Sequence, residues 1–161
     1  MVKVCSENIS PESYDTSIDE SYGFELSNFQ KHAIEAIHTN NHVLITAHTG
    51  SGKTLPAEYA IRYFSGKGKK VIYTSPIKAL SNQKFNEFSK KYPDISFGIL
   101  TGDIKFNPEA DVLIMTTEIL RNQIFHSAFN KTEDTTMLSF EMNMEEELGC
   151  VIFDEVHYIN D

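Results

Sequence analysis

Two short segments of this chain contain the residue types that phosphate chemistry requires. One is the octet Ala47-His48-Thr49-Gly50-Ser51-Gly52-Lys53-Thr54. Its glycines let the backbone curl with the N–H groups pointing inward, its lysine can contact the β and γ phosphates, and the Thr54 hydroxyl can bind Mg²⁺. The other is Val151-Ile152-Phe153-Asp154-Glu155-Val156-His157, in which two carboxylates follow an apolar run. In this order, the two segments predict binding and hydrolysis of a nucleoside triphosphate.

Each segment also has a simpler interpretation. The octet begins with Ala47 rather than glycine, so it could be a glycine-rich turn without a ligand. Its place after an expected strand and at the start of an expected helix favours a phosphate loop, because a helix N-terminus attracts anions. Asp154 and Glu155 could be a solvated acidic loop. At the carboxyl end of a buried parallel strand, however, Asp154 would bind Mg²⁺ and Glu155 would orient or deprotonate the attacking water.

Five short apolar runs are predicted to form the sheet that positions these segments. They are rich in β-branched and aromatic residues and do not alternate with polar ones, which is typical of parallel strands covered on both faces. The runs are 43–45, 71–73, 97–100, 112–115 and 151–153. Helical patterns begin near Ser27 or Asn28, after the octet, after Pro76 and after Thr116-Thr117. The alternation predicts an α/β fold with three layers and a mostly parallel sheet.

Length and charge distribution predict one domain with two acidic additions. At 161 residues the chain can bury a sizeable core. Residues 1–21 hold five acids and one base, and residues 130–149 hold six acids and one base, which leaves 12 acids and 12 bases elsewhere. The net charge of −9 therefore comes from a polar leader (1–21), expected to be disordered, and from an expected surface insertion (130–149). This distribution does not argue against a nucleic-acid partner.

Cysteine content and hydropathy limit the cellular compartments in which the protein is expected. Cys5 and Cys150 are isolated, so the sequence predicts neither a disulfide framework nor a zinc site. No apolar run is long enough to span a bilayer, and the first residues lack the apolar stretch of a secretory signal. These features predict an intracellular protein of the cytoplasm or nucleus, without a membrane partner.

The DEVH box Asp154-Glu155-Val156-His157, together with the octet, resembles the first RecA-like domain of a superfamily 2 helicase. Further blocks resemble motifs of the superkiller-type, exosome-associated RNA helicases, and they occur in that family's order. They are residues 24–30 (Q motif), 74–84 (motif Ia), 101–103 (motif Ib) and 115–121 (a block that contacts nucleic acid). The resemblance covers roughly residues 22–161. It implies a P-loop (RecA-like) ATP-binding domain of an ATP-dependent RNA helicase, with ATP and Mg²⁺ as cofactors.

The resemblance also assigns roles to residues of the nucleotide site. ATP would contact the octet, from Ala47 to Thr54. Lys53, Asp154, Glu155 and His157 would be catalytic, and Thr54 and Asp154 would bind Mg²⁺.

Two residues before the octet would recognise the base. Gln30 has both a donor and an acceptor and would pair with the adenine edge, while Phe24 would stack on the base. Phe24 and the neighbouring Phe29 could instead be ordinary core residues.

RNA would be held by its backbone, without regard to sequence. Short polar groups and N–H groups at strand ends can grip phosphates without reading bases. The residues concerned are Ser75, Pro76, Lys78, Thr101, Gly102, Thr116 and Thr117. Their simpler roles would be helix caps and turns, and an RNA-decay assembly is the wider partner that the resemblance implies.

In the family a Ser-Ala-Thr motif follows, on a strand expected between those ending at Thr46 and Phe153, and then a second RecA-like domain. We therefore expect a domain that is C-terminally incomplete, truncated after the DEVH box. The second domain, needed in cis, carries arginine fingers of the kind worth about 10³–10⁵ in rate. The 161 residues alone are expected to show little unwinding and weak ATP hydrolysis.

Other functions stay open at the level of sequence. The chain could belong to a DNA helicase or translocase, or it could be a non-catalytic, truncated nucleotide-binding remnant. A P-loop kinase or GTPase is disfavoured by the DEVH box and by the Q-like segment.

Overall fold

The computed structural model describes residues 4–5, 18, 22–129, 142 and 146–160. The chain forms two compact units, Met1–Ala60 and Ile61–Asp161, and the division between them falls inside helix α3 (Thr54–Gly66). The predicted leader (1–21) lies almost entirely outside the described residues, as does most of the predicted insertion (130–149). The described part of the first unit consists of helices and loops, and the second unit contains a sheet with its covering helices.

Helix α2 (Asn28–His38) is the longest element that lies wholly within the first unit. Ser27 is its N-cap, and the Ser27 N–H donates to Gln30 Oε1 at 2.9 Å in a capping box. The apolar face of α2 is buried at Ala33, Ile34 and Ile37, while Phe29 on the same helix is half-buried. Ile34 and Leu26 form a small cluster against partly buried side chains of the same unit, namely Ile18, Tyr22, Leu55 and Tyr59.

The strand predicted at residues 43–45 is not present. Residues 41–48 have no regular secondary structure, and Val43 and Leu44 are 45% and 74% exposed. An extended segment becomes a strand only when a neighbouring strand takes up its backbone hydrogen bonds, and none of the described strands does so for this segment. The apolar pattern at 43–45 was therefore wrong as a strand prediction, because a pattern within one segment does not supply the pairing partner.

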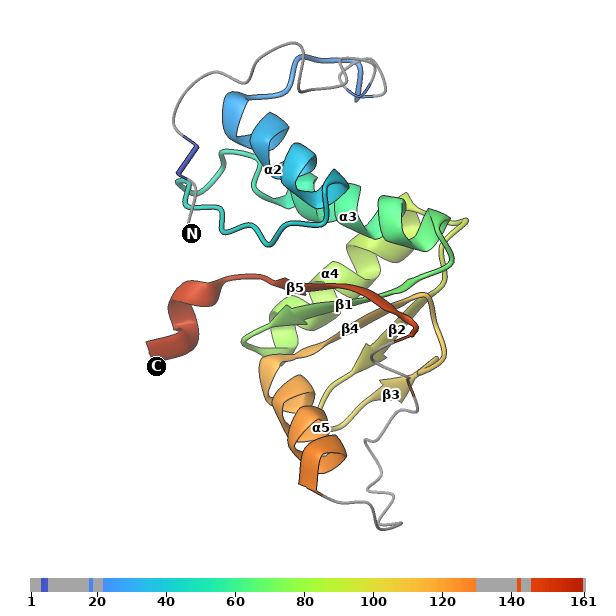
Figure 1. Cartoon of the computed structure of the whole chain (residues 1–161). Coiled ribbons are helices and arrows are strands. Elements are labelled where there is room, and N and C mark those ends of the chain that lie inside the picture. Colours follow the sequence, from blue (N-terminus) through green and yellow to red (C-terminus); the bar gives the residue numbers. More distant parts are fainter. Residues whose placement is uncertain (1–3, 6–17, 19–21, 130–141, 143–145, 161) are drawn as a thin grey trace. The chain divides into compact units, whose positions relative to one another are not determined.

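The other four predicted strands are confirmed, and all lie in the second unit (Figure 1). The sheet has the order β3-β2-β4-β1-β5, and every neighbouring pair is parallel except β2 and β3. The strands are β1 (Lys70–Ser75), β2 (Phe97–Leu100), β3 (Lys105–Phe106), β4 (Val112–Thr116) and β5 (Leu148–Phe153). The sheet is thus mostly parallel, as predicted, and β5 forms one edge of the described part.

Helices α4 (Lys78–Lys91) and α5 (Thr117–Phe129) cover opposite faces of this sheet (Figure 1). Alternate residues of the strands face the two helices. On the α4 side, Phe88 packs against the rings of Tyr73 and Phe97. The α5 side is an aliphatic cluster made of Ile72, Leu100, Ala110, Leu113, Met115, Ile119 and Leu120. Each large apolar side chain buried in this way contributes about 1.5–3 kcal/mol, so the two faces hold the three layers together.

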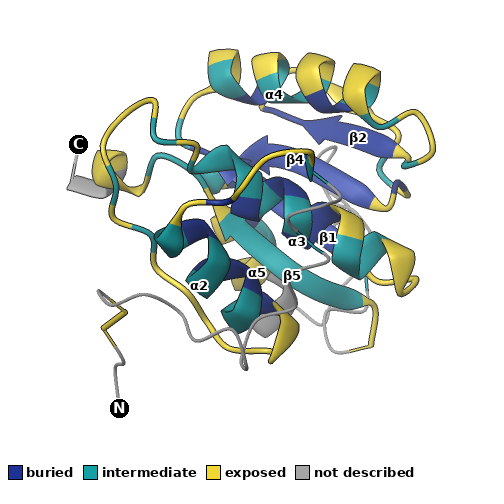
Figure 2. Cartoon of the chain, turned by 90° about the horizontal axis from the view of Figure 1, so that it is seen from above, coloured by how far each residue is buried: buried dark blue, intermediate teal, exposed yellow. Residues whose placement is uncertain are grey.

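The strands differ in burial in a way that bears on the site. Figure 2 shows β1, β2 and β4 as buried, whereas β5 is intermediate. Strand β5 begins at Leu148, three residues before the predicted run, so the last part of the expected insertion belongs to the sheet. Lys69 Nζ donates to the Glu146 carbonyl at 2.5 Å just before this strand. Strand β5 ends at Phe153, and a 3-10 helix (Val156–Asn160) follows it.

Among the described residues, no helix combines the length and apolar character needed to cross a membrane.

Candidate functional site

The octet forms a loop that leads into helix α3, as predicted, but the strand expected before it is not present. Gly50 and Gly52 have φ values of 81° and 83°, in the left-handed region that residues with a Cβ rarely adopt. Helix α3 begins at Thr54, so the first N–H groups of its N-terminus have no partner within the helix. A loop of this shape at a helix N-terminus is suited to hold phosphate oxygens.

The side chains of this loop are also placed for an anion. Lys53 Nζ donates to the Ala47 carbonyl at 2.7 Å, which folds the lysine back across the loop. Ser51 Oγ is buried and has no hydrogen-bond partner among the described residues. His48 and Thr49 are exposed, while Lys53 and Thr54 are half-buried. The residues present thus fit a bound phosphate, which would give the Ser51 hydroxyl and the Lys53 amine a common partner.

Gln30 joins helix α2 to this loop. Its side-chain Oε1 accepts from the Ser27 N–H, and its Nε2 donates to the Gly52 carbonyl at 3.1 Å. Gln30 is buried, and a Cβ at Gly52 would lie 2.7 Å from Gln30 Nε2. Both ends of the amide are therefore occupied, so pairing with adenine would require these bonds to be exchanged.

Phe24 and Phe29 differ in their surroundings. Phe24 is 55% exposed, with its ring 6.0 Å from that of Tyr22, so it is available to stack on a ligand. Phe29 is half-buried on α2. The core interpretation therefore does not suit Phe24.

In the second unit, Asp154 lies directly beyond the carboxyl end of β5. Its N–H donates to the Thr74 carbonyl at 2.9 Å, which continues the β1–β5 ladder by one bond. Its two carboxylate oxygens accept from different donors: Oδ2 from the Tyr73 hydroxyl at 2.5 Å, and Oδ1 from the Glu155 N–H at 3.0 Å. Burial, with the Asp154 charge as a second cause, raises the pKa of Tyr73, so its hydroxyl stays protonated and donates.

Glu155 has an unusual backbone for its residue type. Its φ is 52°, and left-handed conformations of this kind cost a residue with a side chain about 1–2 kcal/mol. Two bonds hold it there: its N–H donates to Asp154 Oδ1, and its carbonyl accepts from the Tyr158 N–H at 3.1 Å. Its carboxylate lies 3.2 Å from His157 Nδ1, and both side chains are more than a third exposed. The turn therefore directs Glu155 and His157 toward solvent as a pair.

The residues predicted to contact nucleic acid lie at the carboxyl ends of the neighbouring strands β2, β4 and β1. Structure thus brings together loops that are far apart in sequence. Several of the hydroxyls, however, bind within the protein: the buried Ser75 Oγ lies 2.7 Å from Ser81 Oγ, and the half-buried Thr117 donates through Oγ1 to the Ser75 carbonyl at 3.3 Å. Thr101 and Thr116 are buried as well, whereas Lys78 and Gly102 are exposed and Pro76 is half-buried. The exposed groups are the ones that a ligand can reach without rearrangement.

Lys78, one of these exposed residues, forms an ion pair. Its Nζ lies 2.6 Å from Asp103 Oδ1, and the Asp103 side chain also accepts from Thr101 Oγ1 at 3.4 Å. The hydrogen bond from Lys78 lowers the pKa of Asp103, with the lysine charge acting in the same direction. An anion that binds Lys78 must therefore compete with a carboxylate.

The donor set fits magnesium better than a transition metal. Within the described ranges, no group of three or more His, Cys, Asp or Glu side chains is placed to hold a metal ion. Magnesium is usually bound through one or two carboxylates together with phosphates, and it prefers hard oxygens. Asp154 in the second unit and Thr54 in the first unit each offer oxygens of this kind.

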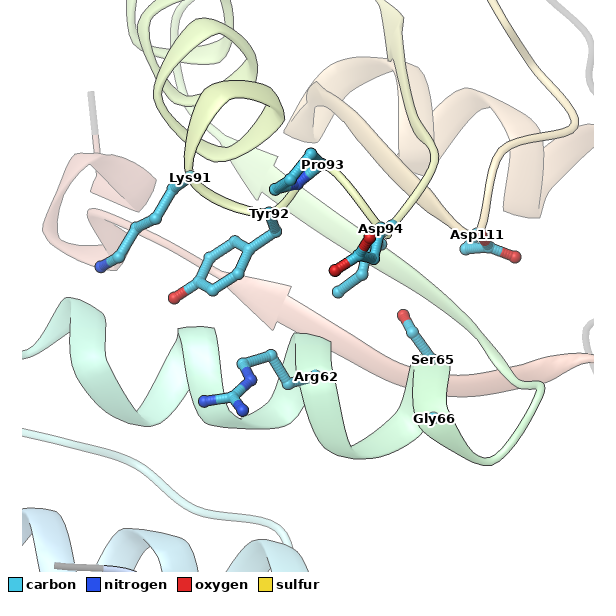
Figure 3. Close-up of a pocket in the computed structure, with 9 residues that line it drawn as sticks. Arg62, Ser65, Gly66, Lys91, Tyr92, Pro93, Asp94 and Asp111 are labelled. Atoms are coloured by element: carbon cyan, nitrogen blue, oxygen red, sulfur yellow. The ribbon is translucent and has the colours of Figure 1, made fainter. Parts of the chain in front are cut away.

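The pocket shown in Figure 3 lies away from these residues. It has a volume of about 510 Å³ and sits at the amino ends of β2 and β4, so it belongs to the opposite edge of the sheet from Asp154. Its lining consists of Arg62, Ser65, Gly66, Lys91, Tyr92, Pro93, Asp94, Ile95 and Asp111. Parallel sheets bind ligands beyond their carboxyl ends, so this pocket is not the candidate nucleotide site.

Three residues of the site were not predicted from sequence. Tyr73 was placed only in an apolar run, Ser81 only in a motif block and Asp103 only in motif Ib. A tyrosine within a fully buried strand is a usable signal, because its hydroxyl must find a partner. No comparable signal marks Asp103, whose role depends on which strand lies next to β2.

Comparison with known proteins agrees with this geometry. The family model described as DEAD/DEAH box helicase matches residues 27–161. Similar proteins include Antiviral helicase SKI2 of Saccharomyces cerevisiae, 45% identical over 141 residues, and Superkiller complex protein 2 of Homo sapiens, 46% identical over 140 residues. Exosome RNA helicase MTR4 of Homo sapiens is 42% identical over 142 residues. These alignments cover 87–88% of this chain but only 10–12% of the relatives, so the chain spans about a tenth of their length.

Proposed function

Because this chain belongs to the DEAD/DEAH box helicase family, we propose that it is the ATP-binding, first RecA-like domain of an ATP-dependent RNA helicase. The observation that carries the proposal is the phosphate loop at the start of α3. Two glycines with positive φ, the folded-back Lys53 and the unpartnered Ser51 hydroxyl together form a cradle of the right chemistry for a nucleotide. The acidic end of β5 supplies the carboxylates that hydrolysis needs.

The roles that we propose for the site residues follow from their chemistry. Residues 47–54 hold the phosphates, with Lys53 on the β and γ phosphates, and Gln30 and Phe24 contact the base. Thr54 and Asp154 are the protein ligands of Mg²⁺, which when bound offsets the charge of the phosphate oxygens. Glu155 orients or deprotonates the attacking water, and the exposed pair with His157 keeps its carboxylate in reach of solvent.

RNA is the proposed polymer. One of the similar proteins is named an exosome RNA helicase. The exposed strand-end groups Lys78 and Gly102 suit contacts to backbone phosphates. Contacts of this kind do not depend on base sequence, as a motor that moves along a strand requires. An RNA-decay assembly is the partner that the relatives suggest.

The phosphate loop is tested by Lys53→Ala, with affinity for a fluorescent ATP analogue as the measurement. Loss of a hydrogen bond to a charged group costs about 1.5–3 kcal/mol, so we expect affinity to fall at least about tenfold. Lys90→Ala, an exposed lysine near the end of α4, is the matched control and should bind like the unaltered chain. Equal affinity for the Lys53 variant would show that this loop does not hold the nucleotide.

The polymer is tested by titrating labelled RNA and DNA oligomers of the same sequence in the presence of a non-hydrolysable ATP analogue. We expect tighter binding of RNA, and the affinity should fall with salt as lysine–phosphate contacts are screened. Tighter binding of the DNA oligomer would support a DNA helicase or translocase instead.

A further inference from the structure

Tyr73 is a buried polar side chain that the roles above do not use. It lies in the middle of β1, opposite Ile152 of β5, and is 1% exposed. Its ring meets the edge of Phe88 of α4, with centroids 5.4 Å apart. The ring therefore belongs to the core, and the hydroxyl at its end reaches the Asp154 carboxylate.

The Asp154 side chain is held on both of its oxygens. Tyr73 occupies Oδ2 and the Glu155 N–H occupies Oδ1. A carboxylate has about four acceptor positions, so two remain for a cation or its water. Of the two donors, the Glu155 N–H sits in the adjoining turn, whereas Tyr73 lies in a strand that is buried from Val71 to Ser75.

We propose that Tyr73 is a positioning residue for the magnesium-binding carboxylate, and that its hydroxyl fixes the orientation in which Asp154 receives Mg²⁺ with the nucleotide. The inference rests on the proposed nucleotide site. Tyr73 itself contacts neither ligand and acts only through Asp154. Residues that hydrogen-bond to a metal ligand in this way typically change metal affinity ten- to a hundred-fold when they are replaced.

A purely structural role predicts a different outcome. If the hydroxyl served only to tie β1 to β5, its loss would lower stability and leave the metal dependence of nucleotide binding unchanged. Thr74 provides the comparison, because its hydroxyl is equally buried in β1 and also bonds to β5, donating to the Ile152 carbonyl at 3.2 Å. Its side chain does not bond to the Asp154 carboxylate.

The experiment measures the affinity of the 161-residue chain for a fluorescent ATP analogue in EDTA and then over a Mg²⁺ titration. For Tyr73→Phe, which keeps the ring against Phe88, we expect unchanged affinity in EDTA and a Mg²⁺ midpoint raised about tenfold. Thr74→Val should leave that midpoint in place. In an Asp154→Asn background, Tyr73→Phe should have no further effect on the midpoint, since the group that it positions is already altered.

Each result has a distinct meaning. An unshifted midpoint in Tyr73→Phe, or an equal shift in Thr74→Val, would overturn the positioning role. If the unaltered chain bound no nucleotide at all, the proposed function itself would fail. Should Tyr73→Phe not fold, the hydroxyl proton of the unaltered Tyr73 can be followed by NMR. Its resonance should move when Mg²⁺ is added to the nucleotide-bound chain, and a resonance that stays in place would count against the proposal.

Discussion

In the phosphate loop, Gly50 and Gly52 adopt positive φ and residues 47–54 are half-buried or exposed, whereas Asp154 follows a strand that is paired with β1, which is buried from Val71 to Ser75. The loop offers backbone N–H groups, and its shape depends on which residues lack a Cβ. The acidic end offers side-chain oxygens, and their position depends on a ladder between segments distant in sequence. The phosphate loop, the local half of this comparison, is therefore sensitive to backbone conformation, and the acidic end of β5, its packing half, is sensitive to packing.

The packing half should be disturbed most by Gly149→Ala. A Cβ at Gly149, near the start of β5, would lie 2.8 Å from both Lys69 Cβ and Phe64 Cδ1. Overpacking of this kind typically costs about 1–3 kcal/mol, so we expect the free energy of unfolding in urea to fall by that amount. We also expect a weaker Mg²⁺-dependent part of nucleotide binding, because Asp154 lies at the other end of the same strand.

Gly66→Ala is the control for this variant, since a Cβ at Gly66 meets nothing within 4 Å. A Gly149 variant as stable as the Gly66 variant would mean that β5 is not held as tightly as its register indicates.

The local half should respond to Gly52→Ala with a loss of nucleotide affinity. A left-handed backbone conformation costs a residue with a Cβ about 1–2 kcal/mol. If the loop changes shape to avoid this strain, nucleotide affinity should fall roughly tenfold. The new Cβ would also displace Gln30 Nε2. Gly50→Ala has the same backbone strain but no clash, so it should lose less affinity in the same titration.

Gly68→Ala tests whether this effect belongs to the loop. Gly68 also has positive φ, 69°, and open space around it, but it lies outside the octet. The Gly68→Ala variant should lose stability but keep its nucleotide affinity. If it lost as much affinity as Gly52→Ala, the effect of Gly52→Ala could not be assigned to the phosphate loop.

The carboxyl ends of β2, β4 and β1, where we propose that RNA binds, should show a smaller effect on affinity. Asp103→Asn removes the carboxylate that pairs with Lys78, so RNA phosphates no longer compete with it. Exposed ion pairs are weak, and we expect RNA affinity to rise only about twofold at low salt, with the difference vanishing at high salt. Asp94→Asn, an exposed acid at the opposite edge of the sheet, changes net charge equally and should have no effect. Equal gains in both variants would point to net charge rather than to Lys78.

The smallest effect concerns Cys150 in β5. Burial raises the pKa of its thiol to about 11, while Cys5 is exposed. At pH 8, iodoacetamide should therefore modify Cys5 and spare Cys150 until urea unfolds the sheet, which mass spectrometry can follow.

The pH dependence has a definite sign. The folded state holds the Cys150 thiol proton more tightly than the unfolded state. The contribution of this thiol to the free energy of unfolding is therefore fully present below about pH 8.5 and is lost as pH rises toward 11. Cys150→Ala should remove that part of the alkaline loss of stability. Rapid alkylation of Cys150 in the folded chain would show that β5 opens readily.

Prediction from sequence succeeded for features that depend mainly on the residues of one short segment. Runs of β-branched and aromatic residues identified β1, β2, β4 and β5, and Ser27 was found at the start of α2. The run at 43–45 has the same character, yet it forms no strand, because strand formation needs a partner as well as a propensity. The apolar run at 71–73 predicts a buried strand, which is correct for the Tyr73 ring, but it does not indicate that the hydroxyl meets Asp154.

The sequence by itself determined the order of the chemical groups along the chain, and it put glycine at positions 50 and 52, where the lack of a Cβ permits the positive φ that the loop adopts. Only the tertiary structure decided which of these groups meet. Tyr73 and Asp154 are 81 positions apart, and they touch because β1 lies between β4 and β5 rather than elsewhere in the sheet. Strand order is set by the hydrogen-bond ladders and by the covering helices together, and no short segment of the chain contains that information.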